Sequence, residues 1–266
     1  MSDTVLLEVC IDSMESALAA ERGGARRVEL CSNLMEGGVT PSAGLISNIR
    51  RKLSIDVHVM IRPRAGDFCY SAEEFETMEQ DVLTAKQLGA KGVVLGILTS
   101  DGEVDVPRTR HLVQIARPLN TTFHRAFDMS PDLGKSLADV IAAGADRVLT
   151  SGGEQRVEDG ILAIAKLVQA AGERVAVMVG SGITESNVHR IIRETGAREI
   201  HASLRTRVPS PMRYRNDKIS MGAAKGREYN RMIVLEDTVR RLLESANNGV
   251  GRVPGAVSPK NGLPQC

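Results

Sequence analysis

Short runs of β-branched residues alternate along the chain with longer segments of helical periodicity. The alternation repeats roughly every 20 to 35 residues, a spacing typical of βαβ units. It therefore predicts a parallel sheet with a helix between each pair of strands. Eight strands are expected, at residues 5–10, 27–31, 56–62, 92–97, 120–124, 146–150, 174–179 and 199–203.

Capping signals mark the ends of several predicted helices. We expect Asp12 to cap the helix of MESALAAERGG and Pro41 to open PSAGLISNIRRKL. Ser71 and Glu74 have the spacing of a capping box before EFETMEQDVLTAKQLG. Glycine takes the left-handed C-terminal cap without steric cost. Five glycines are expected in this role: Gly24, Gly89, Gly144, Gly172 and Gly196.

Eight βα units in about 245 residues match the size of a TIM barrel. The alternative is an open doubly wound sheet, which would carry an early G-x-G-x-x-G after its first strand. Here the first strand runs into CIDSME, and GSGITE at 180–185 comes late and lacks the third glycine. The sequence therefore predicts an α/β fold, a TIM (β/α)8-like barrel forming a single domain over 1–246. A disordered tail is expected over 247–266, which is rich in Gly, Pro and Asn.

Composition and charge narrow the class of protein. Lys and Arg number 34 against 33 Asp and Glu, a net charge of +1, which argues against nucleic acid or an anionic membrane as a partner. The longest apolar stretch, near 92–98, is too short to cross a bilayer, and residues 1–9 lack a signal-peptide pattern. The four cysteines form no CxxC pair, which excludes a zinc ribbon and favours a reducing compartment. A cytoplasmic location is expected.

The strands alternate apolar and reactive residues, although buried parallel strands usually read as continuous apolar runs. In the first strand Leu7 and Val9 share one parity, while Glu8 and Cys10 share the other. If the apolar parity packs on the helices, the other parity lines the barrel interior. The ionisable residues predicted there are Glu8, Glu29, His58, Arg62, His124 and His201. Such groups must bind a ligand, open to water, or pair in a buried network, which is the alternative interpretation.

Several of these residues close their strands, where TIM barrels hold their active sites. Cys10, Cys31, Arg62, His124 and Ser203 are last or nearly last in theirs. This grouping favours an isomerase, epimerase or lyase acting on a small phosphorylated or carboxylated metabolite. The predicted catalytic residues are Glu8 or Glu29 as general base, His124 as acid, and Arg62.

Two glycine-rich turns follow the sixth and seventh predicted strands, where many barrels bind phosphate through backbone N–H groups. Arg62 and Arg64 would supply the opposite charge. The alternative is that these loops need glycine only for tight turns. The predicted anion-binding residues are Arg62, Arg64, Ser151, Gly152, Gly153, Gly180, Ser181, Gly182, His201 and Ser203.

Cys10 and Cys31 end neighbouring strands at matching positions, so their thiols could share a ligand. Soft thiolates select Cu(I), with Cys69, Met60 and His58 as conceivable additional donors. The alternative is that both cysteines are small core hydrophobes.

The basic segment RTRVPSPMRYR, residues 205–215, is interpreted as a solvated or intersubunit loop, or as one that closes over an anionic ligand. A homo-oligomer is expected.

Several long strings give the chain a family resemblance over about residues 5–245: LLEVCIDSMESALAAERGGARRVELCS, EGGVTPS, IRPRAGDFCYS, TFHRAFDM, VLTSGG, EIHASL and SPMRYRN. In these strings it resembles the copper homeostasis protein CutC family. The resemblance implies a TIM-like barrel in the cytosol and a role in copper handling, with Cu(I) bound by two cysteines. Those two match Cys10 in EVCIDS and Cys31 in ELCS. The expected partner is thus a copper ion or a small anionic metabolite, with no organic cofactor.

Overall fold

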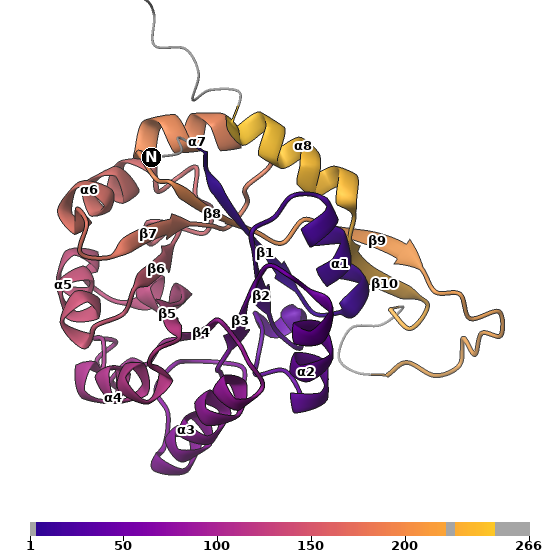
Figure 1. Cartoon of the computed structure of the whole chain (residues 1–266), viewed down its shortest axis with the longest axis horizontal. Helices are drawn as coiled ribbons and strands as arrows, with labels where there is room; N and C mark the ends of the chain where they lie inside the picture. Colours follow the sequence, from indigo (N-terminus) through magenta and orange to yellow (C-terminus); the bar gives the residue numbers. More distant parts are fainter. Residues whose placement is uncertain (1–3, 222–226, 248–266) are drawn as a thin grey trace, which may run out of the picture.

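A closed ring of eight parallel strands forms the centre of the molecule, with helices around it (Figure 1). This computed structural model describes residues 4–221 and 227–247. Each strand pairs with the next along the chain, and β8 pairs with β1 to close the barrel. The strands are β1 (Leu6–Ile11), β2 (Arg27–Leu30), β3 (Asp56–Met60), β4 (Gly92–Leu95), β5 (Asn120–Phe123), β6 (Arg147–Thr150), β7 (Ala176–Val179) and β8 (Glu199–Ala202).

Helices follow the strands as the alternating pattern predicts, so the single-domain TIM barrel is confirmed. They are α1 (Met14–Arg22), α2 (Ala43–Lys52), α3 (Ala72–Gln87), α4 (Val106–Ala116), α5 (Leu133–Ala143), α6 (Ile161–Ala171), α7 (Val188–Thr195) and α8 (Glu236–Asn247). Two short 3₁₀ helices, η1 (Leu34–Glu36) and η2 (Arg125–Met129), lie in the loops after β2 and β5. Within the described residues, no helix combines the length and apolarity needed to cross a membrane.

The helix starts were predicted to within two residues. The capping box of Ser71 and Glu74 is present at the start of α3. Asp12 does not cap α1, because the hydroxyl of Ser13 accepts the N–H of Ser16 instead. Likewise α2 begins after Pro41, at Ala43, with Ser42 as its cap. In both corrections a serine next to the expected residue provides the accepting oxygen.

Glycines end most of the helices, as expected. Gly24, Gly89, Gly144 and Gly196 all have positive φ, between 73° and 97°. Gly172 is an exception, because its φ of 56° is combined with a ψ of −127°, outside the left-handed helical region. Only glycine adopts such a conformation readily.

The basic segment after β8 is not a simple loop. It contains β9 (Arg205–Pro209), which pairs antiparallel with β10 (Asn230–Val234) outside the barrel (Figure 1). Interpreting the segment by its charge missed the strand, whose partner lies over twenty residues further along the chain.

The start of the predicted tail shifts by one residue, since Asn247 belongs to α8 and its side chain accepts the N–H of Val5 at 3.2 Å. Residues 248–266 lie outside the described part of the chain.

The two faces of the strands separate as their period of two predicts. Leu7, Val9 and Ile11 belong to the large apolar core between barrel and helices. The opposite parity points into the barrel, where Cys10 packs instead with Cys31, Met60 and Val94. The inward face of the strands therefore carries the reactive side chains.

Candidate functional site

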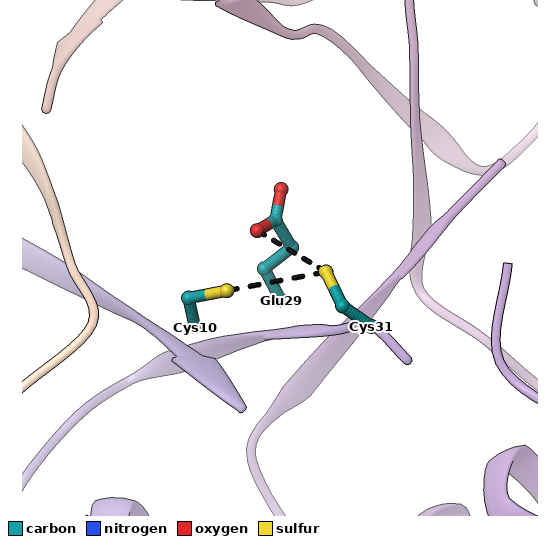
Figure 2. Close-up of side chains that lie close together, drawn as sticks. All are labelled: Cys10, Glu29 and Cys31. Carbon is teal, nitrogen blue, oxygen red and sulfur yellow. Dashed lines mark hydrogen bonds between the residues drawn. The ribbon is translucent and has the colours of Figure 1, made fainter. Parts of the chain in front are cut away.

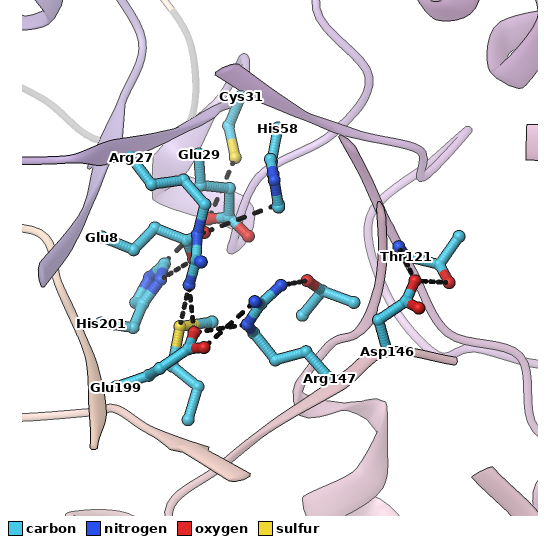
Figure 3. A network of polar contacts seen from close by, with 12 residues as sticks. Glu8, Arg27, Glu29, Cys31, His58, Thr121, Asp146, Arg147, Glu199 and His201 are labelled. Atoms are coloured by element: carbon cyan, nitrogen blue, oxygen red, sulfur yellow. Dashed lines mark hydrogen bonds and ion pairs between the residues drawn. The ribbon is translucent and has the colours of Figure 1, made fainter. Parts of the chain in front are cut away.

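The barrel interior near the amino ends of the strands, here called the lower layer, holds a buried network of opposite charges (Figure 3). Arg27 on β2 lies between Glu8 on β1 and Glu199 on β8, at 2.5 Å from each carboxylate. Arg147 on β6 binds the same Glu199 through two nitrogens, at 2.5 and 3.1 Å. These guanidiniums satisfy the two carboxylates, so this layer is the paired network of the alternative interpretation.

Sequence reasoning missed Arg27, Arg147 and Glu199 as interior residues. The signal was present, because Arg27 shares the parity of Glu29 and Glu199 shares that of His201. All three are the first residues of their strands, however, and the prediction favoured residues near the strand ends.

Glu8 is fully buried and connects this network to His201, which lies nearer the carboxyl ends of the strands. Its Oε1 lies 2.9 Å from Nδ1 of His201, and its Oε2 contacts Arg27. Burial alone would raise the pKa of Glu8, but the Arg27 charge and His201 hold it well below its usual value. Burial would similarly lower the pKa of His201, yet the acidic groups of Glu29, Cys10 and Glu8 raise it well above the usual value. Glu8 thus holds an imidazolium in place. Its oxygens are engaged away from the cavity, which does not fit the general base predicted from the sequence.

The two predicted metal ligands lie side by side (Figure 2). Sγ of Cys10 is 3.9 Å from Sγ of Cys31, and the thiol of Cys31 lies 3.5 Å from Oε2 of Glu29. Strand register explains why the two sulfurs are close. Cys10 on β1 pairs with Glu29 on β2, and Cys31 comes two residues after Glu29, so its side chain points to the same face. With Glu29, the two thiols form a set of ligand atoms within 4.8 Å of one another.

The thiols differ in acidity although they are neighbours. The hydrogen bond from Cys31 lowers the pKa of Cys10 to about 5 against the effect of burial, with further help from His201. That same bond, together with burial, raises the pKa of Cys31 well above its usual value. Burial and the nearby Cys10 charge raise the pKa of Glu29. The site therefore combines an acidic thiol, Cys10, with a thiol and a carboxyl that both hold their protons more tightly than usual.

A cavity of about 510 Å³ opens above the thiols at the carboxyl ends of the strands. This volume is in the range of small-molecule sites. Eight site residues predicted from the sequence line it together: Cys10, Glu29, Arg62, His124, Ser181, Gly182, His201 and Ser203. Glycines make room for the imidazoles, since a Cβ at Gly96 would lie 2.5 Å from the His124 ring. A Cβ at Gly92 would similarly lie 2.6 Å from the His58 ring.

The glycine turn after β6 is filled by an internal anion. The Asp128 carboxylate accepts the N–H groups of Ser151 and Gly153 and the hydroxyls of Thr150 and Ser151. The N–H of Gly152 donates to Thr150 Oγ1 instead. Arg125 neutralises Asp128 at 2.7 Å. The donors predicted for a phosphate are thus already used, so Ser151, Gly152 and Gly153 do not fit that role.

The turn after β7 reaches the cavity through Ser181 and Gly182. Gly180 donates its N–H to the carbonyl of Thr150, and an added Cβ there would lie 2.9 Å from Leu149. Close packing therefore accounts for this glycine. Ser181 donates its hydroxyl hydrogen to the carbonyl of Gln155.

Three further candidates lie away from the cavity. Arg64 binds Glu74 and Asp67, at 2.5 and 3.0 Å, and packs over Tyr70, so it faces away from the predicted anion site. Cys69 is exposed in the same loop and is not among the cavity residues. His58 lies lower in the barrel, 3.8 Å from Glu8, and burial lowers its pKa to about 4.

Fold and site together define a TIM barrel that holds a thiol pair and ionisable side chains in a cavity at the carboxyl ends of its strands. Residues 5–206 match the model of the CutC family. The chain belongs to that family. It is 48% identical over 240 residues to a CutC family protein of Chromobacterium violaceum, covering 90% of this chain and 97% of that one.

A human relative carries a more specific name. The chain is 46% identical over 244 residues to a human protein named copper homeostasis protein cutC homolog, covering 91% of this chain and 89% of the human one. A crystal structure described as a CutC copper homeostasis protein of Streptococcus agalactiae superposes with a TM-score of 0.72 and 37% identity, over 75% of this chain and 99% of that one. Thiamine phosphate pyrophosphorylase of Pyrococcus furiosus, at 14% identity and a TM-score of 0.56, shows the fold alone.

Proposed function

We propose that the protein binds one Cu(I) ion through the sulfurs of Cys10 and Cys31 and serves copper homeostasis. The observation that carries this proposal is the 3.9 Å separation of the two buried sulfurs. Taking metal–sulfur bonds of about 2.3 Å, as in zinc thiolates, two sulfurs this far apart can share one ion. The names of the relatives support copper as the metal.

The surroundings of the sulfurs favour a soft ion. Met60, Val94 and Leu34 pack around both thiols and provide an apolar wall. Among these side chains Met60 is the one further soft donor, whereas Cys69, also predicted as a donor, lies outside this cluster and the cavity. Glu29 adds an oxygen, but its raised pKa favours the protonated form, which is a poor ligand for a hard cation.

Binding is expected to release a proton from Cys31. Cys10 is already a thiolate above about pH 5, whereas the Cys31 thiol keeps its proton because it donates to Cys10. A metal ion that binds both sulfurs must displace that proton. The affinity should therefore increase with pH through the neutral range.

An anaerobic Cu(I) titration against a competing chelator tests this function. The wild type should bind one equivalent, and Cys10→Ser or Cys31→Ser should lose the tight site. Cys69→Ser is the matched control, because this exposed cysteine should leave the affinity unchanged. Tight binding retained in both single variants of the buried pair would refute the proposal.

A second candidate function is an isomerase, epimerase or lyase acting on a small acid. The observation that favours it is Glu29, whose Oε1 is buried on the cavity wall and has no hydrogen-bond partner in the described residues. Its raised pKa suits a general acid next to the Cys10 thiolate. Proton NMR in D₂O should show enzyme-dependent exchange of C–H groups in a panel of keto and hydroxy acids. The exchange should be lost in Glu29→Gln, and no exchange with any acid would count against this function.

We also propose that the protein acts in the cytoplasm as a homo-oligomer. Three described cysteines are free thiols, which suits a reducing compartment. Large apolar side chains are exposed in the segment after β9, namely Met212, Tyr214, Ile219 and Met221. Light scattering coupled to gel filtration should give a multiple of 28.7 kDa, and the monomer mass would contradict this assembly.

A further inference from the structure

Arg62 holds a buried positive charge on the cavity wall. It is only 5% exposed, and its Nη1 and Nη2 donate to the backbone carbonyls of Glu36, Gly38 and Gly66. No carboxylate in the described residues forms an ion pair with it, unlike Arg27 and Arg147 below. A buried guanidinium normally has an anionic partner, because burying an uncompensated charge is costly. Here backbone carbonyls and the face of the Phe68 ring stabilise the charge in place of a carboxylate.

His124 presents an unused hydrogen-bond donor on the same cavity wall. Its Nδ1 accepts the N–H of Ala126 at 3.2 Å, so the ring hydrogen is on Nε2. Burial and the Arg62 charge lower the pKa of His124 to about 3, which keeps the ring neutral. Nε2 is buried and has no partner among the described residues. A buried polar atom of this kind calls for an explanation, such as a ligand.

One aromatic ring positions both groups. Cζ of Arg62 lies 5.0 Å from the centre of the Phe68 ring, and the His124 ring centre lies 4.9 Å from it. The guanidinium and the imidazole thus share a rigid support in the loop after β3. A positive charge and an N–H donor held in this way are suited to a carboxylate, whose two oxygens accept from both.

The other cationic groups whose pairing decides the ligand, Arg125 and His201, already have acidic partners. Arg125 binds Asp128, and His201 binds Glu8. The backbone donors after β6 that would recognise a phosphate are bound to Asp128. Arg62 is therefore the cavity cation that has no anionic partner in the described residues, and the turn after β6 offers it no free donors for a shared phosphate.

We propose that the cavity binds a small organic acid, with its carboxylate between Arg62 and His124 and its remaining atoms toward Cys10 and Glu29. The cavity of about 510 Å³ accommodates a molecule of a few carbons. This inference names the ligand class of the second candidate function, but it concerns binding and requires neither copper nor turnover.

Thermal unfolding with added acids tests the proposal. Acetate, succinate and citrate serve as probes, inorganic phosphate as the competing anion, and succinamide as the uncharged analogue of succinate. At least one carboxylate should raise the Tm of the metal-free protein by about 2 °C or more, increasing with concentration. Succinamide and phosphate should raise it by less than half as much.

Variants locate the effect. Arg62→Met should abolish the shift, and Arg64→Ala, on the same loop but outside the cavity, should keep it. His124→Asn keeps an acceptor for the Ala126 N–H while it removes the Nε2 donor, so it should reduce the shift even if Arg62→Met fails to fold. Cys31→Ser removes a proposed copper ligand that does not line the cavity, so it should retain the shift, which separates this site from copper binding. A shift unaffected by His124→Asn, or one produced equally by succinamide or phosphate, would overturn the proposal, as would no shift with any of the three carboxylates.

Discussion

At the scale of single residues, glycines decide where the imidazoles can lie. Gly92 and Gly96 lie in and just after β4, and side chains there would collide with the rings of His58 and His124. Both histidines are buried and their pKa values are lowered, to about 4 and about 3, with burial as the main cause. The interior therefore holds neutral imidazoles in space that only glycine leaves free.

These depressed pKa values predict a loss of stability in acid. The unfolded chain protonates a histidine near pH 6.5, whereas folded His124 stays neutral down to about pH 3. Below pH 6.5 the unfolded state binds the extra proton, so the free energy of unfolding falls. Between pH 6.5 and 5 this histidine should cost about 2 kcal/mol.

Urea unfolding at the two pH values measures this effect. The difference in unfolding free energy between them should shrink by about that amount in His124→Asn. His189→Asn, at an exposed position on α7, is the control and should behave as the wild type. An equal pH dependence in all three proteins would show that His124 is not held neutral.

At the scale of elements, the inward-facing side chains of the strands form two layers that differ in chemistry. The layer where the strands begin is a closed set of ion pairs, in which Arg147 and Arg27 share Glu199. The layer where they end holds the thiols and the cavity. The sequence predicted a ligand site and a buried network as alternatives, and the structure contains a buried network and a cavity at different heights along the same strands.

The ion-pair layer predicts strong coupling between its members. Arg147→Met should destabilise the fold by about 3–5 kcal/mol, because it leaves the Glu199 charge partly uncompensated inside the barrel. Arg147→Met combined with Glu199→Gln should cost less than the sum of the two single changes. A double-mutant cycle by urea unfolding measures the coupling, and additive effects would contradict it.

At the scale of the whole molecule, α8 closes the barrel where the first and last units meet. It packs on α1 so closely that a Cβ at Gly23 would lie 2.5 Å from Cβ of Val239. Gly23 has a φ of −73°, so its small size matters here and its backbone freedom does not. Asn247 completes the contact through the N–H of Val5.

This packing predicts the effect of one added methyl group. Gly23→Ala should destabilise the protein by about 1–3 kcal/mol, because α8 must shift to accommodate it. Gly44→Ala in α2 is the control, since an added Cβ there meets only the Ser42 hydroxyl at 4.0 Å. Thermal unfolding compares the two, and an unchanged Tm in Gly23→Ala would contradict the close contact.

The barrel was predictable because period and parity are local properties of the sequence. The eight strands and the inward placement of Glu8, Glu29 and His201 follow from alternation alone. The occupant of the turn after β6 does not, because Asp128 reaches it from a different loop. Likewise the sequence shows Arg62 and Arg64 as equals, whereas tertiary contacts direct one into the cavity and the other toward Glu74.

The most direct test of the copper site is X-ray absorption at the copper edge of the protein loaded with one equivalent of Cu(I). Two sulfur neighbours should surround the metal in the wild type, and this two-sulfur environment should be absent in Cys31→Ser, which loses the tight site. A copper environment of nitrogen and oxygen in the wild type, or one that is the same in Cys31→Ser, would contradict the assignment of the ion to the thiol pair.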